Sequence, residues 1–188
     1  MIETIRNFGK SYRDAKLVHR LDKDTSGCQV IAKNNKFLRN CNKLISERKV
    51  KKTYQAIVHG NWIHKDGIYE INIEKNMLIG KERMVRISDG GKIAKTFFKV
   101  IESSKHFSLI QCELITGRTH QLRVHLSELG FPIVGDKKYG IKENKLPSSS
   151  GHKKRMYLHA NSFISKDLNI HINVKPPKEF KKILKNDE

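Results

Sequence analysis

Most apolar residues of this 188-residue chain lie in short runs of strand length, and turn residues separate these runs. We predict strands at 27–33, 52–60, 68–73, 83–87, 94–101, 107–115, 157–164 and 168–174. We predict helices at 36–48, 120–129 and 179–184. Many strands and few helices in mixed order indicate an α+β fold. Its core would be a mixed, largely antiparallel central sheet with a few flanking helices.

Particular residues mark the helix boundaries and the loops. Asn34 is suited to cap the first helix, whereas Gly130 ends the second and Pro132 prevents it from resuming. The chain length suits one domain, and neither a repeat nor a linker divides residues 1–188. The segment 142–155 combines serines, a proline and basic residues without periodicity, so we expect either a mobile connection or a basic contact surface.

The formal net charge of +19 points to a polyanionic partner, and nucleic acid is the first candidate. A lysine-rich composition from an AT-rich genome would produce the same imbalance. The sequence has neither a helix-turn-helix pattern nor a zinc-finger pattern, which argues against a DNA-binding module. We find no signal peptide and no apolar run of membrane-spanning length. The three cysteines are far apart and form no CxxC motif, so we expect core positions and a cytoplasmic protein.

Two crowded polar clusters interrupt the apolar runs, and these are the candidate sites. The first is LVHRLDKDTSG, residues 17–27, and the second is ITGRTHQLRVHL, residues 115–126. A half-buried aspartate in the first cluster needs a cationic partner, and an arginine of the second could bind it with two hydrogen bonds. His120 and His125 are five residues apart, which does not suit a helical metal site. Phosphate-loop and GxSxG motifs are absent from the sequence.

Five ordered motifs carry a family resemblance. The first cluster resembles the HRLDxxTSG signature of the RluA-type RNA pseudouridine synthases, and the second resembles their TGRTHQIRVHL motif. Similar family segments match KKTYQAIVHG, GFPIVGDKKYG, and YLHA with the closing VKPPKEF. The motifs extend from Leu17 to Phe180. The stretch GKERMVRISDGGKIAKTFFKV most resembles the RluC branch, which acts on large-subunit ribosomal RNA.

The resemblance implies that a uridine in RNA becomes pseudouridine without cofactor or metal. It makes Asp22 the catalytic carboxylate, which either attacks the sugar C1′ or abstracts a sugar proton. Either role requires the ionised form. The resemblance places Arg118 in contact with this aspartate and makes Tyr54 the residue that stacks on the target base. Arg20 would enter the RNA stack in place of the everted base.

For other residues of the same motifs we expect roles outside catalysis or leave the role open. His19 either touches RNA or holds its loop. Asp24 is expected to be a loop or capping residue, because the family signature leaves its position variable. Asp136 and Gly135 are expected to be structural residues of a turn, with a positive φ at the glycine.

The resemblance also implies that parts of the family pattern are missing. Family members begin with a strand that carries a Lys-Pro pair, and several have an S4 RNA-binding module. We therefore expect residues 1–188 to be a pseudouridine synthase catalytic domain that is truncated at its N-terminus and has no S4 domain. We expect a monomer with an exposed sheet edge. The alternatives are a non-catalytic RNA-binding or ribosome-assembly protein, and transfer RNA as the substrate.

Overall fold

The computed structural model describes residues 2–79, 82–141, 155–185 and 187, so nearly all of the predicted loop 142–155 lies outside the described residues. The elements follow the chain in this order: α1 (Ile2–Arg6), η1 (Lys10–Tyr12), β1 (Lys16–Leu17), β2 (Ser26–Gly27), β3 (Ile31–Ala32), α2 (Asn35–Ser46), β4 (Lys51–His59), β5 (Gly67–Ile79), β6 (Glu82–Ile87), β7 (Lys92–Ser103), β8 (Phe107–Leu114), α3 (Gln121–Glu128), β9 (Leu158–Ser165), β10 (Ile170–Asn173) and α4 (Glu179–Lys185).

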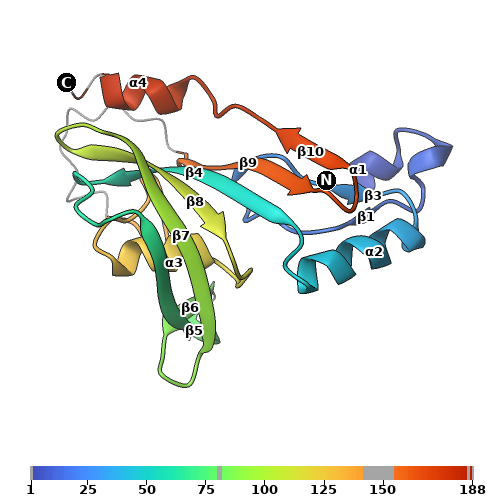
Figure 1. Ribbon diagram of the computed structural model, residues 1–188, viewed down its shortest axis with the longest axis horizontal. Helices are drawn as coiled ribbons and strands as arrows, with labels where there is room; N and C mark the ends of the chain where they lie inside the picture. The colour runs from blue at the N-terminus through green and yellow to red at the C-terminus, as the bar shows by residue number, and fades with distance from the viewer. Residues whose placement is uncertain (1, 80–81, 142–154, 186, 188) are drawn as a thin grey trace.

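An eight-stranded sheet forms the centre of the molecule (Figure 1). Seven strands lie in the order β10-β9-β4-β8-β7-β5-β6, and β2 pairs separately with β9. The β2–β9 pair is parallel, and the other pairs are antiparallel. This arrangement confirms the predicted α+β fold with a mixed, largely antiparallel sheet.

The helices begin and end close to the predicted boundaries. The Asn34 side chain accepts a hydrogen bond from the Phe37 N–H at 2.8 Å, which caps α2. Helix α2 buries Cys41 and Leu44, and it lies beside β1 and β3 (Figure 1). Gly130 follows α3 with φ +85°, a left-handed conformation that glycine adopts without strain. The described helices include none that is long and apolar enough to cross a membrane.

Helix α3 packs into the main hydrophobic core, which also includes residues of α2 and the central sheet. Leu122 and Leu126 of α3 pack in the same cluster as Phe98 of β7 and Ile110 of β8. Residues 121–126 of this helix are all buried, so it is not an ordinary amphipathic surface helix. The buried helix holds its first turn rigidly against the sheet.

Two features near the N-terminus differ from the sequence predictions. Helix α1 and the short helix η1 were not predicted. The predicted strand 27–33 is instead two short strands with different partners: Ser26–Gly27 pairs with β9, whereas Ile31–Ala32 pairs with β1. An apolar run indicates that a segment has an extended backbone, but it does not specify which strand each part pairs with.

Candidate active site

Asp22 lies in the loop between β1 and β2, and close backbone packing holds that loop. The Asp22 carbonyl accepts the N–H of Thr25 at 3.0 Å, which makes a turn. Gly27 then runs against β9 with φ +113°, and a Cβ at this position would lie 2.2 Å from the Ala160 carbonyl oxygen. The side chain of Ser26 lies 3.0 Å from His159 Nδ1. Ser26 and Gly27 therefore anchor the loop to β9, and Thr25 closes its turn.

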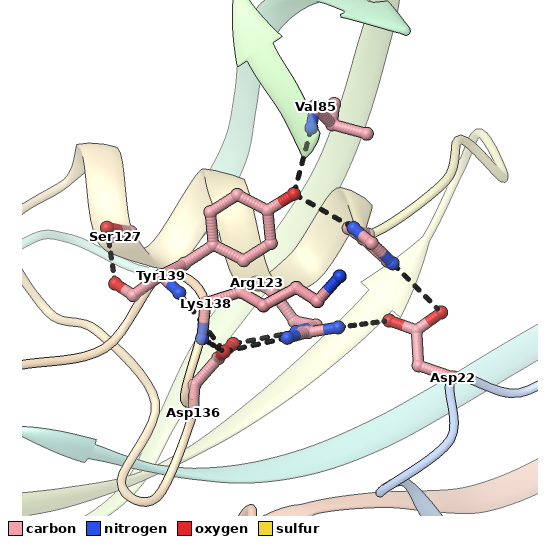
Figure 2. Close-up of polar contacts among 8 residues, drawn as sticks. Asp22, Val85, Arg123, Ser127, Asp136, Lys138 and Tyr139 are labelled. Carbon is pink, nitrogen blue, oxygen red and sulfur yellow. Dashed lines mark hydrogen bonds and ion pairs between the residues drawn. The ribbon is translucent and has the colours of Figure 1, made fainter. Parts of the chain in front are cut away.

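Arg123 joins Asp22 to a second, fully buried aspartate. Its Nη1 donates to Asp22 Oδ2 at 3.2 Å, while Nε and Nη2 donate to the two oxygens of Asp136, both at 2.7 Å. Figure 2 shows the guanidinium between the two carboxylates. Asp136 also accepts the backbone N–H groups of Lys138 and Tyr139 at 2.9 and 3.1 Å. Asp136 thus fixes the guanidinium of Arg123, which directs an N–H group of its remaining nitrogen at Asp22.

Charge reinforces this arrangement. Burial alone would raise the pKa of Asp136, but the hydrogen bonds and charge of Arg123 and two backbone N–H groups lower it below the usual value. Burial likewise opposes the charge of Arg123, yet Asp136 and Asp22 raise the pKa of its guanidinium above the ordinary range. The buried pair is therefore ionised, and Arg123 presents a permanent positive charge to Asp22.

The predicted contact between Arg118 and Asp22 is wrong. Arg118 is exposed, and its Nε donates to the Ile93 carbonyl at 3.1 Å. Helix α3 begins only at Gln121, so Arg118 lies in the preceding turn, whereas Arg123 lies inside the helix and faces the aspartates. The second cluster does supply the cation, as predicted, but from its later arginine. Arg118 lines the cleft described below, and its contact with RNA stays a prediction.

A buried amide shapes the turn that leads into α3. The Gln121 Oε1 accepts hydrogen bonds from the Thr116 hydroxyl and the Arg118 N–H, both at 2.9 Å. Its Nε2 donates to the Lys95 carbonyl at 2.9 Å and to the Thr96 hydroxyl at 3.0 Å. This side chain thereby ties the ITGRTHQ segment to β7. The sequence analysis missed this role, although a polar residue at a helix start is the signal that could have indicated it.

His120 faces the oxygen of Asp22 that Arg123 does not bind. Its Nε2 is 4.0 Å from Asp22 Oδ1, and its Nδ1 is 2.8 Å from the Tyr139 hydroxyl. Burial lowers the pKa of His120; the charges of Arg123 and Lys138 act in the same direction, and those of Asp22 and Asp136 act against it. Burial outweighs the two carboxylates, so the pKa of His120 lies below the usual histidine value, which favours the neutral imidazole.

A cleft of about 1030 Å³ opens in front of Asp22. Tyr54 of β4 lines it and is otherwise largely buried, and burial raises the pKa of its hydroxyl. Lys52, two residues earlier on the same strand, also lines the cleft, and burial lowers the pKa of its ammonium group. The exposed side chain of Arg20 lines the cleft as well. A carboxylate, an aromatic ring and several cations therefore share one concave site.

His19 and Asp24, two polar residues of the same cluster as Asp22, differ in their surroundings. His19 Nε2 accepts the Val30 N–H at 3.1 Å, and its ring stacks on Phe163. Burial and the nearby Lys52 lower the pKa of His19 to about 4. The structure therefore shows that His19 holds the loop; it also lines the cleft, and its contact with RNA stays a prediction. Asp24 is exposed outside the cleft lining, and its predicted capping contact is not formed within the part of the chain that the structure describes.

The turn prediction at 135–136 is confirmed, but it is incomplete. Gly135 has φ +75°, and Asp136 accepts two backbone N–H groups of the turn. The same aspartate also holds Arg123, a role that the sequence did not indicate. Among the residues that the structure describes, no group of three or more His, Cys, Asp or Glu could hold a metal ion.

Comparison with known proteins agrees with this geometry. The family model described as RNA pseudouridylate synthase matches residues 3–128. The chain belongs to this family. Ribosomal large subunit pseudouridine synthase C of Salmonella typhi is 40% identical over 162 residues, which are 85% of this chain and 51% of that protein. The protein of the same name from Escherichia coli K12 is 39% identical over the same shares. The chain thus spans about half the length of these curated relatives.

Solved structures support the same family. Human RNA Pseudouridylate Synthase Domain Containing 4 is 30% identical with a TM-score of 0.74, covering 91% of this chain and 75% of that one. Human RNA Pseudouridylate Synthase Domain Containing 1 is 29% identical with a TM-score of 0.73, covering 90% and 72%. The family resemblance inferred from the sequence motifs is therefore confirmed, including the likeness to the RluC branch.

Proposed function

We propose that this chain is an RNA pseudouridine synthase that acts on large-subunit ribosomal RNA, with Asp22 as its catalytic carboxylate. The observation that carries the proposal is the position of Asp22 in the cleft. One of its oxygens is bound by a charged Arg123, and the other faces His120 at the cleft wall and accepts no hydrogen bond from any residue that the structure describes. The names and identities of the ribosomal relatives support the choice of RNA.

The reaction is an isomerisation that needs an ionised carboxylate and a pocket that holds the detached uracil ring. The N1–C1′ bond of a uridine breaks, the uracil turns, and a C5–C1′ bond forms, while the ring loses a proton at C5 and gains one at N1. Asp22 either attacks C1′ or removes a sugar proton, and Arg123 stabilises the carboxylate charge for either role. Tyr54 offers the flat face on which the turned uracil stacks.

The cations of the cleft suit an everted nucleotide. Lys52 lies two residues from Tyr54 on β4, so the side chains project from the same face of the strand. It therefore offers a positive charge to a phosphate next to the stacked base. Arg20 is exposed at the cleft and is free to stack in the gap that the everted base leaves.

A pseudouridine assay on unmodified ribosomal RNA tests the proposal. Carbodiimide labelling followed by primer extension reports each new pseudouridine as a stop. The parent chain should produce stops in large-subunit RNA, and Asp22→Asn should produce none, because an amide is neither nucleophile nor base. Asp24→Asn is the matched control: the same change two residues away, at an exposed carboxylate, should leave the stops unchanged.

Other outcomes separate the alternatives. Stops in unmodified transfer RNA alone would assign that substrate and reject the ribosomal one. A folded parent chain that binds RNA but produces no stops in either RNA would contradict catalysis and favour a non-catalytic RNA-binding protein. Equal stops from the parent and Asp22→Asn would reject the assignment of Asp22.

A further inference from the structure

The two oxygens of Asp22 have different surroundings. Oδ2 accepts the Nη1–H of Arg123 at 3.2 Å, whereas Oδ1 faces Nε2 of His120 at 4.0 Å. His120 is mostly buried, with 15% of its side chain exposed, so its ring is confined beside the carboxylate. Whether His120 acts on Asp22 depends on which of its nitrogens carries the hydrogen.

The hydrogen bonds of Tyr139 and the charge of Asp22 together favour one of the two tautomers. The Tyr139 hydroxyl accepts the backbone N–H of Val85 at 3.0 Å and lies 2.8 Å from His120 Nδ1 (Figure 2 shows Val85, Tyr139 and Asp22). The hydroxyl can donate its single hydrogen to Nδ1, and the hydrogen of a neutral imidazole then lies on Nε2. In the opposite tautomer the hydroxyl would accept Nδ1–H, and the electron-rich lone pair of Nε2 would face the negatively charged Asp22 carboxylate, which is electrostatically unfavourable.

Tyr139 is itself held firmly in this position. Its N–H donates to Asp136 and its carbonyl accepts the Ser127 hydroxyl at 2.9 Å. The guanidinium carbon of Arg123 lies 5.1 Å from the centre of its ring, within the range of a cation–π contact. The same aspartate therefore fixes both neighbours of Asp22: it binds Arg123 directly, and it fixes His120 through Tyr139.

The backbone also sets the direction of the imidazole. His120 has φ +52° immediately before α3, and histidine is among the few residue types enriched in this left-handed conformation. Its carbonyl accepts the Val124 N–H at 3.0 Å, so the helix holds the residue from its C-terminal side. Two independent restraints, one on the backbone and one on Nδ1, thus aim Nε2 at Asp22.

We propose that His120 is a positioning residue for Asp22: Tyr139 holds its imidazole in the neutral Nε2–H form, and this N–H group directs the reactive oxygen Oδ1. The inference deepens the proposed function and rests on it for its catalytic part. The 4.0 Å separation is longer than a hydrogen bond, and catalytic hydrogen bonds commonly shorten when the substrate binds. Arg123 and His120 together would then fix both oxygens of the carboxylate.

The tautomer is tested without reference to activity. Long-range ¹H–¹⁵N correlation spectra of the full chain with labelled histidine distinguish Nε2–H from Nδ1–H, and loss of one signal in His120→Gln assigns it. We expect His120 in the Nε2–H form at neutral pH, and a shift toward mixed tautomers in Tyr139→Phe, which removes only the hydroxyl. Tyr69→Phe is the matched control, because the Tyr69 hydroxyl donates to the Lys65 carbonyl at a different site. An Nδ1–H form in the parent chain would overturn the inference.

The catalytic part is tested with two substitutions of similar shape. Gln retains an N–H donor near the position of Nε2, whereas Met has the same length and no donor, and both have the same strain at φ +52°. We expect kcat to fall about 10- to 100-fold in His120→Met, the effect of one hydrogen bond to a charged group. In His120→Gln we expect kcat within a few-fold of the parent value. KM and the melting temperature should match between the two variants.

The outcomes distinguish this inference from the proposed function. An active parent chain with equal kcat in His120→Gln and His120→Met would refute the positioning role and leave the role of Asp22 intact. A parent chain that converts no uridine would refute the proposed function and, with it, the catalytic part of this inference. The spectra would then still decide whether Tyr139 holds the Nε2–H form.

Discussion

Asp136→Asn is the substitution that should most sharply test how the site is held together. Asp136 accepts four hydrogen bonds, two from Arg123 and two from the backbone of Lys138 and Tyr139, and its side chain is fully buried. The amide oxygen of asparagine can retain the two backbone bonds. Its –NH₂ group would then face an N–H group of Arg123, donor against donor, and the guanidinium would lose the countercharge that holds it.

The expected magnitude follows from breaking a buried ion pair on one side, which costs about 3–5 kcal/mol. Asp22 remains 3.2 Å from Arg123 and offsets part of this cost, so we expect a loss of about 3 kcal/mol in the free energy of unfolding. A domain of this kind has about 5–15 kcal/mol in total. With a slope of about 2 kcal/mol per molar urea, the unfolding midpoint should fall by about 1–2 M.

The pH dependence has a definite sign. Arg123 and the backbone hold the pKa of Asp136 below its usual value in the folded state. The stabilisation is therefore fully present above the unfolded pKa of about 3.9, and it is lost as the pH falls through the lower folded pKa. The stability difference between parent and variant should be constant near neutrality and should shrink below about pH 4.

Urea unfolding of the full chain, followed by circular dichroism, measures this difference. Asp24→Asn is the control, because its exposed carboxylate should change the free energy of unfolding by less than about 0.5 kcal/mol. A loss below about 1 kcal/mol in Asp136→Asn, with an unchanged urea slope, would refute the reasoning that the Asp136–Arg123 pair holds the site.

Three further predictions concern the cleft and its loop. Gly27→Ala should lower the free energy of unfolding by more than about 1 kcal/mol in the same urea assay, because a Cβ would clash with the Ala160 carbonyl and φ is +113°; unchanged stability would contradict the tight β2–β9 packing. Tyr54→Phe should retain RNA affinity, whereas Tyr54→Leu should weaken it by about 1–3 kcal/mol in a filter-binding assay; equal affinities would exclude stacking. Lys52→Met should reduce the slope of log affinity against log salt by about 0.7, and an unchanged slope would show that this lysine contacts no phosphate.

Local features of the fold were predictable because neighbouring residues along the chain determine them. The Asn34 cap, the stop at Gly130 and the apolar periodicities all depend on hydrogen bonds and packing within a few residues. The same holds for the strands that alternate or run continuously apolar, such as β4 and β8. Motif order along the chain was also enough to identify the family, whereas the catalytic role of Asp22 stays a prediction.

The partners of Asp22 could not be predicted in the same way. Arg118 and Arg123 are both in the second cluster, and the choice between them depends on where α3 begins and which face it turns to the sheet. Arg123 lies 101 residues from Asp22 along the chain, so only the packing of α3 against the sheet brings them together. Local patterns carry no information about such a distance.

The sequence by itself therefore indicated most of the elements and the family, and it selected Asp22 as the candidate catalytic carboxylate. Tertiary structure alone decided that Arg123 and His120 flank it and that Asp136 is an anchor as well as a turn residue. The physical reason is that periodicity and capping involve short-range interactions, whereas a buried ion pair forms only where packing brings distant groups within about 4 Å and excludes water.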